Sequence, residues 1–277
     1  MLRNSALGSF AFSLLILLTV SGCKSRQTSS LFDGKSLAGW EVYLRAASDT
    51  TPPPGLNNDP DHVFSVAAVD GSPCIRVSGE TFGGLSTVEE FSNYHLRLQF
   101  KWGEAKTTAF RDRKRDSGLL YHAVGPHGVD AGSWMRSQEF QIQETDCGDY
   151  WGVAGGSFDI PSVQNDKGEW VYSPSGALLT FNETSPQGRR CIKSRDMEKP
   201  HGEWNQLDLY CYGDSSVHVL NGEVVMRLYH SAQVDSRGKR PLTKGKFQIQ
   251  SEGCEIFFRG IEWEPIDGIP SNLTERQ

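Results

Sequence analysis

The sequence lacks the signatures of several common protein classes. Its 277 residues contain no Walker-type phosphate loop, no dinucleotide-binding glycine motif, no H-E-x-x-H motif and no G-x-S-x-G motif. Clustered lysine and arginine are scarce, and the net charge is −6. Because nucleic-acid binding needs clustered basic side chains, this charge distribution argues against a nucleic-acid partner. Helical periodicity is nearly absent, which argues against a helical fold.

The N-terminus has the features of an export signal. Phe10–Val20 is an apolar run too short to span a bilayer comfortably, and the small residues before Cys23 follow it directly. The V-S-G-C ending resembles the bacterial lipoprotein box, in which the cysteine is lipidated. We therefore predict a signal peptide over residues 1–22, a polar tether over residues 23–30 and a lipid anchor on Cys23. The expected location is the periplasmic face of the outer membrane or the cell surface. Plain secretion is the alternative.

Five further cysteines give no obvious cross-link. They are Cys74, Cys147, Cys191, Cys211 and Cys254. An odd number leaves at least one thiol unpaired, and no C-x-x-C spacing indicates a zinc site or a redox pair. Cys211 and Cys254 both lie in strand-like runs. We predict that they are small core residues, with spatial proximity of the two as the alternative.

Residues 31–277 are predicted to form one all-β domain. In Tyr94–Trp102 (YHLRLQFKW), apolar and polar residues alternate with the period of a half-buried strand. Asn221-Gly222 lies between β-branched runs, which is a strong hairpin signal. Strand candidates recur at short intervals without βαβ alternation. This pattern predicts a jelly-roll sandwich of two antiparallel sheets.

Two stretches are predicted to be loops. Thr51–Asp61 is too rich in proline and asparagine for a strand. Residues 153–200 are rich in glycine, proline and serine, with only short strand-like pieces. A loop that long inside a compact domain usually covers a site or is mobile.

Two distant strands place amides and carboxylates on one face. The predicted polar side chains, from the runs E-F-Q-I-Q and F-Q-I-Q-S-E, include Glu139, Gln141, Gln143, Gln250 and Glu252. The apolar residues between them would face the core, because successive strand side chains alternate between the two faces. Such donors and acceptors suit the hydroxyl groups of a sugar. An ordinary solvated sheet face is the alternative.

The spacing of the carboxylates permits a second interpretation. Glu139, Gln141 and Glu144 occupy the E-x-D-x-x-E positions of sandwich-fold β-glucanases. In those enzymes the outer carboxylates act as nucleophile and general acid and stand ~5 Å apart. Gln141 replaces the middle aspartate, and Glu144 would point toward the core in a regular strand. Both points weaken this interpretation.

Other side chains are predicted to belong to the same site. His122 would share a strand face with Gly118, and it is a candidate base or ligand with a pKa near neutrality. A structural hydrogen bond is the alternative for this histidine. Asp149, Tyr150 and Trp151 lie between two glycines. Aromatic rings beside a cleft stack on sugar rings, whereas burial in the core is an equally good interpretation.

Six segments together resemble one family. They are LFDGKSLAGW, DSGLLYHA, QEFQIQETDCGDYWG, HGEWNQLDLY, VHVLNGEVV and FQIQSEG with IFFRGIEW, in order over residues 31–265. They resemble the 3-keto-disaccharide hydrolase family. The resemblance implies a concanavalin A-like jelly roll and cleavage of glycosides whose C3 hydroxyl is oxidised to a ketone. Such a ketone acidifies the C2 hydrogen, so a base can remove it and the C1 substituent can leave by β-elimination before hydration.

The resemblance also implies roles for individual residues. Glu139 is the first choice for a catalytic carboxylate, and His122 is the second. The residues expected to orient substrate or stabilise charge are Gln141, Gln143, Asp149, Tyr150, Trp151, Gln250, Glu252 and Arg259. The expected partner is a glycoside or oligosaccharide, with no definite cofactor. A divalent cation as stabiliser of the enolate stays an open alternative.

Three positions depart from the family pattern. Asp116 stands where the family usually has asparagine, and Ser251-Glu252 stands where many members have a histidine after the glutamine. Gly260 replaces a further asparagine. If the missing histidine is catalytic in the family, the chain binds without cleaving. A non-catalytic carbohydrate-binding lipoprotein is therefore the alternative to an enzyme.

Overall fold

A computed structural model describes Met1 and residues 28–274. The predicted lipidation site Cys23 and, apart from Met1, the predicted signal peptide lie outside the described residues. Within the described part of the chain, no helix is long and apolar enough to cross a membrane.

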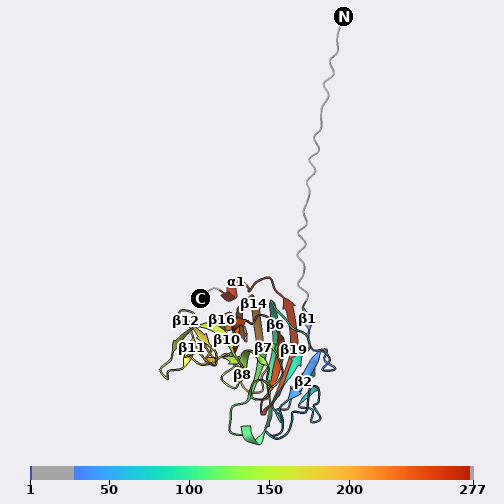
Figure 1. The fold of residues 1–277 in the computed structure, drawn as a ribbon. Helices are drawn as coiled ribbons and strands as arrows, with labels where there is room; N and C mark the ends of the chain where they lie inside the picture. Colours follow the sequence, from blue (N-terminus) through green and yellow to red (C-terminus); the bar gives the residue numbers. More distant parts are fainter. Residues whose placement is uncertain (2–27, 275–277) are drawn as a thin grey trace.

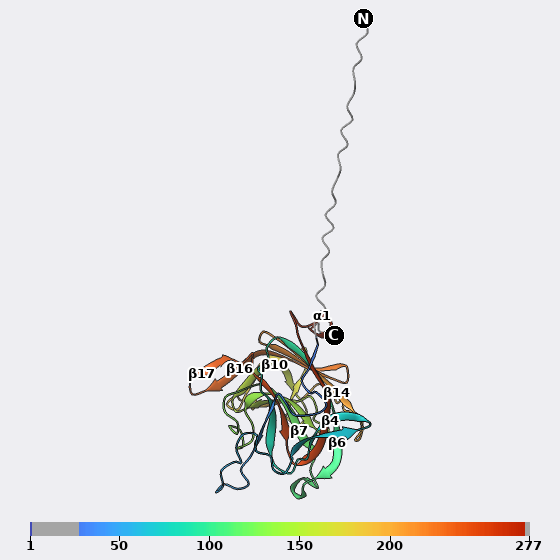
Figure 2. The same cartoon turned by 90° about the vertical axis from the view of Figure 1, so that its right-hand side faces the viewer.

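The described residues form two antiparallel sheets (Figures 1 and 2). The larger sheet comprises β1 (Ser29–Ser30), β3 (Phe64–Val69), β4 (Ser72–Val77), β6 (Tyr94–Lys106), β10 (Gly156–Gln164), β11 (Trp170–Tyr172), β12 (Ala177–Phe181), β14 (Asn205–Tyr212), β15 (Ser215–Leu220), β16 (Glu223–Asp235), β17 (Gly238–Pro241) and β19 (Cys254–Pro265). The smaller sheet comprises β2 (Trp40–Leu44), β5 (Gly83–Thr87), β7 (Asp116–Val124), β8 (Arg136–Gln143), β9 (Tyr150–Val153), β13 (Arg190–Cys191) and β18 (Lys246–Ser251). Two short helices, η1 (Thr108–Phe110) and α1 (Ser271–Thr274), complete the described part.

The strand order explains which residues meet. The central path of the larger sheet is β11-β10-β16-β15-β14-β6-β19-β4-β3, and that of the smaller sheet is β13-β9-β8-β7-β18-β5-β2. Strands distant in sequence, such as β8 and β18, are therefore separated only by β7. The predicted all-β, concanavalin A-like jelly roll is confirmed.

The hydrophobic core lies between the two sheets. Phe140 and Ile142 of β8 are fully buried there, and the ring of Phe140 stacks on His218 of β15 at 4.3 Å between centroids. Phe247 of β18 packs against Tyr94 of β6 at 4.8 Å. The period of two in these strands leaves Glu139, Gln141 and Gln250 on the face of the smaller sheet that points away from the core, whereas Gln138 faces inward with Phe140.

The structure confirms one predicted connection and corrects another. Asn221 and Gly222 have φ of 52° and 87° and join β15 to β16 as a tight hairpin. The predicted long loop over residues 153–200 is wrong, because this stretch contributes β10, β11, β12 and β13. Phe158 and Ile160 are fully buried on β10 and supply the alternation that the glycine-rich composition obscured.

All five described cysteines are buried and unpaired. The prediction that Cys211 and Cys254 are core residues is confirmed. The fold of the described residues therefore depends on packing between the sheets, with no contribution from disulfide bonds.

Candidate functional site

The polar face of the smaller sheet carries the candidate site. Glu139 of β8 lies opposite Leu120 of β7 on one side and Trp151 of β9 on the other. Gln141 lies opposite Gly118 of β7. Glu139 is 6% exposed, although it points away from the core. The predicted orientation of Glu139 and Gln141 is therefore confirmed, but the face is more enclosed than a solvated sheet surface.

Gly118 lets two polar side chains approach each other. A Cβ atom at this position would collide with Gln250 Oε1 of β18 and with Glu139 Oε1 of β8. The side chains of Gln250 and Glu139 therefore lean over the backbone of β7 from opposite sides. Any other residue at this position would have to displace these two carboxyl and amide groups.

Glu139 is a buried carboxyl without a cationic partner. No lysine or arginine of residues 28–274 forms an ion pair with it. Burial raises the pKa of Glu139 well above its ordinary value, and the nearby Glu252 and Asp116 raise it further. Arg189 opposes this shift only in part. Such an isolated, perturbed carboxyl is typical of a functional site.

Asp116 and Glu252 extend the acidic group. Their backbones pair as an isolated antiparallel bridge between the start of β7 and the end of β18. Burial is the main cause that raises the pKa of Asp116 to about 7 and the pKa of Glu252 to about 8. We call Glu139, Asp116 and Glu252 the carboxyl cluster. The pKa values of Asp116 and Glu252 therefore lie near neutral pH, far above the range in which ordinary carboxyls ionise.

Two polar atoms beside Glu139 have no partner in the protein. Trp151 Nε1, from the strand next to Glu139, is a buried donor without an acceptor. Gln250 Oε1, above Gly118, is a buried acceptor without a donor. Buried polar atoms in folded proteins are nearly always hydrogen-bonded. An unused donor and an unused acceptor flanking a carboxyl suit a hydroxylated ligand.

Comparisons with known proteins identify the family of the chain. The family model described as the 3-keto-alpha-glucoside-1,2-lyase-like domain matches residues 27–264. The chain belongs to this family. Membership places the protein among carbohydrate-active proteins. No curated protein matches the sequence at a significant level.

Three solved structures are similar to this member of the lyase-like family at low sequence identity. A candidate glycosyl hydrolase from Parabacteroides distasonis is 18% identical with a TM-score of 0.48, over 87% of this chain and 94% of that chain. A second one from the same organism is 20% identical with a TM-score of 0.48, over 87% and 100%. A carbohydrate-binding module of Bacillus subtilis is 8% identical with a TM-score of 0.43, over 73% and 91%. These values carry no information about substrate.

His122 of this lyase-like domain does not lie where we expected. Its φ of 51° coincides with an irregularity in the pairing of β7 with β8. The ring therefore packs edge-on against Tyr94 and Tyr121 in the core, whereas Leu120 contacts Trp134 in a separate cluster. Burial lowers the pKa of His122 to about 4. The expected shared face is wrong, and the catalytic role stays a prediction that the geometry does not support.

Arg259 lies on the other sheet. It belongs to β19, its guanidinium group stacks 3.8 Å from the ring centroid of Trp204, and its Nε donates to Gln99 Oε1 at 2.8 Å. Because β19 is part of the larger sheet, Arg259 does not join Glu139. We expected Arg259 to orient substrate beside Glu139, and the structure corrects this expectation.

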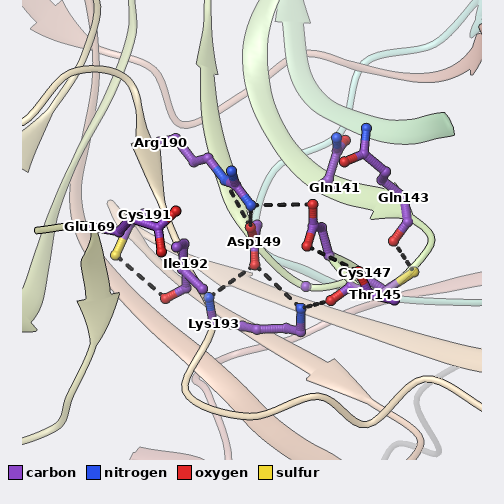
Figure 3. Close-up of polar contacts among 12 residues, drawn as sticks. Gln141, Gln143, Thr145, Cys147, Asp149, Glu169, Arg190, Cys191, Ile192 and Lys193 are labelled. Atoms are coloured by element: carbon purple, nitrogen blue, oxygen red, sulfur yellow. Dashed lines mark hydrogen bonds and ion pairs between the residues drawn. The ribbon is translucent and has the colours of Figure 1, made fainter. Parts of the chain in front are cut away.

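Asp149 and Tyr150 have structural partners, and those of Asp149 are drawn in Figure 3. Asp149 is fully buried and accepts hydrogen bonds from Arg190 Nη2 at 2.6 Å and from the backbone nitrogen of Lys193 at 3.0 Å. Tyr150 is buried in the core, where its hydroxyl donates to Gln138 at 2.7 Å. Of the three neighbours predicted to bind substrate, only Trp151 lies beside Glu139.

Glu144 is also separated from the carboxyl cluster. Its carboxylate accepts from Arg115 Nη1 at 2.7 Å and from the Arg115 backbone at 2.8 Å. These bonds and the charge of Lys106 outweigh partial burial and lower the pKa of Glu144. A carboxyl held in its ionised form is a poor general acid, so the geometry does not favour the β-glucanase interpretation.

Some site residues gave no sequence signal. Asp130 and Arg189 come from loops, and Arg189 Nη1 lies 3.5 Å from Asp130 Oδ1. Both influence the charge of Glu139. Asp116 was visible only as a departure from the family pattern. Among residues 28–274, no group of three or more His, Cys, Asp or Glu is arranged to hold a metal ion.

Proposed function

We propose that the protein cleaves 3-keto-glycosides and that Glu139 exchanges the proton at C2 of the substrate. The observation that carries this proposal is a buried carboxyl without a cationic partner, flanked by an unpaired donor on Trp151 and an unpaired acceptor on Gln250. The family supports the same class of substrate. The C3 ketone of the substrate is what makes such a weakly acidic C–H bond accessible to a carboxylate.

The reaction follows from the acidity of the C2 hydrogen. In its ionised form, Glu139 takes this proton, and the electron pair of the C–H bond moves into the enolate of the C3 ketone. The enolate then expels the C1 substituent, and a double bond forms between C1 and C2. Water adds across that double bond to complete net hydrolysis. A raised pKa makes Glu139 a stronger base at the moment it is ionised.

The neighbouring groups supply the remaining needs of the reaction. The leaving oxygen requires a proton, and Asp116 and Glu252 retain protons near neutral pH. The enolate oxygen requires a donor, and the indole nitrogen of Trp151 is unused. Gln250 Oε1 can accept from a sugar hydroxyl. Acid, base and donor are thus present in one enclosed site.

The decisive experiment uses the wild-type protein with matched substrates. An aryl glucoside of each anomer and its 3-keto derivative are incubated with the protein, and released phenol is measured. We expect release only from a keto compound. Cleavage of the unoxidised glucoside would contradict the proposal and favour an ordinary glycosidase. Binding of either compound without turnover would instead favour a carbohydrate-binding protein.

Export and lipidation at Cys23 form part of the same proposal. A surface or periplasmic enzyme would meet its glycoside outside the cytoplasm. Mass spectrometry of the protein purified from its native membranes tests this prediction. An N-terminal peptide that begins with unmodified residues upstream of Cys23 would contradict it.

A further inference from the structure

The side-chain amide of Gln141 lies between two members of the carboxyl cluster. On β8 it is two residues from Glu139, and it lies diagonally across from Asp116 of β7. With one orientation of the amide, its nitrogen is 3.3 Å from Asp116 Oδ1. With the amide reversed, its nitrogen donates to Glu139 Oε1 at 2.7 Å and to the carbonyl oxygen of Ser117 at 3.1 Å. The reversed amide satisfies both of its ends, whereas the first orientation places the amide oxygen against the Ser117 carbonyl oxygen and requires a proton on Glu139.

An amide group is a donor at one end and an acceptor at the other. The nitrogen can satisfy an ionised carboxylate, whereas the oxygen can hydrogen-bond only to a carboxyl that carries its proton. Gln141 therefore cannot satisfy two ionised carboxylates at the same time. It cannot satisfy two protonated carboxyls equally well either, because its nitrogen needs an acceptor. The arrangement fits one ionised and one protonated group.

We infer that Glu139 and Asp116 share a single proton and that the orientation of the Gln141 amide decides which carboxyl holds it. In one state Glu139 is protonated and donates to the amide oxygen, while Asp116 is ionised. In the other state the amide nitrogen donates to ionised Glu139, and Asp116 carries the proton. One carboxyl releases its proton to water and the other takes a proton from water, so the total is unchanged.

The second state gives Glu139 the form that can remove a proton. This consequence rests on the proposed function, whereas the shared proton itself does not depend on any substrate. The reversed amide also satisfies the carbonyl of Ser117, which the other orientation leaves facing an oxygen. Gln141 is therefore a positioning residue that prepares the base without touching the reacting atoms.

The charges around Glu139 favour retention of a proton. Glu252 and Asp130 are acidic neighbours that raise its pKa, and Arg189 is the basic neighbour that lowers it. Burial is the largest effect. Ionising Asp116 as well would place a second charge in the same enclosed space, which low local polarity makes unfavourable.

The charges around Asp116 lead to the same conclusion. Asp116 Oδ2 accepts a hydrogen bond from Gln143, and Lys114 favours its ionised form. Burial and the nearby Asp146 favour the protonated form and dominate. Glu252, the bridge partner, faces Asp130 and Arg45. Neither Glu139 nor Asp116 forms an ion pair among the described residues, and the Gln141 amide is the group that can contact both carboxyls.

Asp116→Asn is a conservative probe of the shared proton. Asparagine keeps the size and the hydrogen-bonding capacity of the side chain but cannot hold a titrating proton.

The test measures the titration of Glu139 in the free protein by nuclear magnetic resonance of labelled glutamate carboxyl carbons. The Glu139 signal is assigned by its loss in Glu139→Gln. We expect two titration steps in the wild type, because coupled groups share their titrations. Asp116→Asn should remove the step that belongs to Asp116 and lower the midpoint of the Glu139 titration by about one pH unit. Gln141→Met keeps the size of the side chain but removes its donor and acceptor. In this background, Asp116→Asn should shift the midpoint of the Glu139 titration by less than half as much as it does in the wild type.

Each outcome decides the inference. An equal effect of Asp116→Asn in the wild type and in the Gln141→Met variant would overturn it, because the coupling would then be charge repulsion through space. If Gln141→Met does not fold, the wild-type side-chain amide resonance of Gln141 is followed instead. The chemical shift of this amide should change with pH at the same midpoint as the Glu139 carboxyl. A chemical shift that stays constant with pH would overturn the inference. Failure of the proposed function would appear separately, as absence of cleavage with an intact titration.

Discussion

Glu139 and Asp149 are two buried carboxyls of the same sheet region with opposite surroundings. Asp149 is surrounded by donors, since Arg190 and Lys193 both bond to it (Figure 3). Among the described residues, Glu139 has only the amide of Gln141 within hydrogen-bond distance and more acids than bases nearby. In the sequence, both residues occur in one polar stretch and were predicted to serve one site.

The comparison shows that burial alone does not identify a functional acid. A buried carboxylate with cationic partners holds structure together, and removing one partner leaves the others unsatisfied. A buried carboxyl without such partners keeps a labile proton instead. We therefore expect substitution of Glu139 to reduce activity and substitution of Asp149 to reduce stability.

The largest expected effect is on the activity of Glu139→Gln. Removing the proton-exchanging group should lower kcat/KM on a 3-keto-glycoside by about 10²–10⁴-fold, the usual contribution of a general acid or base. The melting temperature should not fall, because the amide avoids the unfavourable ionisation of a buried acid. Steady-state kinetics and a thermal melt measure both quantities.

Glu144→Gln is the matched control for this substitution. It changes the same chemical group five positions along the chain, where Arg115 already neutralises the carboxylate. We expect kcat/KM within about two-fold of the wild type, since Glu144 lies outside the carboxyl cluster. Full activity of Glu139→Gln, or equal losses in both variants, would remove Glu139 from the mechanism.

Asp149→Asn should instead reduce stability. We expect the free energy of unfolding to fall by about 2–3 kcal/mol, because Arg190 and the Lys193 backbone lose a charged acceptor. The full effect of a broken buried pair is not expected, since Arg190 reaches solvent and asparagine still accepts one bond. Urea unfolding measures the change. A loss of activity in protein that is still folded and equally stable would show that Asp149 has a chemical role.

Asp116→Asn should change how stability depends on pH. Below about pH 4 the Asp116 carboxyl is protonated in both the folded and the unfolded chain, so the substitution should have little effect there. From about pH 4 to about 7 the unfolded carboxyl ionises while the folded one retains its proton, and wild-type stability falls as the pH rises. The variant should therefore melt higher than the wild type at pH 8, by at least about 2–4 °C. Equal melting temperatures at both ends of this range would contradict the raised pKa.

Trp151→Phe should have the smallest effect. It removes the indole donor but keeps an aromatic ring, and one hydrogen bond to substrate contributes about 1 kcal/mol. We expect kcat/KM to fall about 5–10-fold on a 3-keto-glycoside. Trp204→Phe on the other sheet is the control, because its indole donates to Asp70 far from β8 in the strand order. Equal losses in both variants would argue against a substrate contact at Trp151.

Strand periodicity was enough to predict the fold and the orientation of Glu139. Alternation is a local property, so the buried Phe140 and the outward Glu139 could be assigned from their own strand. The same reasoning failed at His122, where a pairing irregularity reverses the side chain. A single left-handed residue changes the face of a strand, and the letters around it do not indicate that change.

Long-range neighbours were beyond sequence reasoning. Arg259 and Gln250 are close in sequence, yet they belong to different sheets. The charges that surround Glu139 come from loops such as those of Asp130 and Arg189. Their approach is set by how the sandwich closes, which no local pattern encodes. The sequence was enough to identify Glu139 as a candidate, but it did not show why the pKa of Glu139 is raised.

Gly118 determines how closely the side chains of Glu139 and Gln250 approach each other. The closeness of Glu139 and Gln250 is enforced by the absence of a side chain between them, and not by a bond. Salt, acid or a chelator cannot weaken a constraint of that kind. One added methyl group can abolish it while leaving every charged group in the protein unchanged. The spacing of Glu139 and Gln250 is therefore insensitive to the solution, although the protonation of the carboxyls is not, and it is sensitive to change at a single, uncharged position.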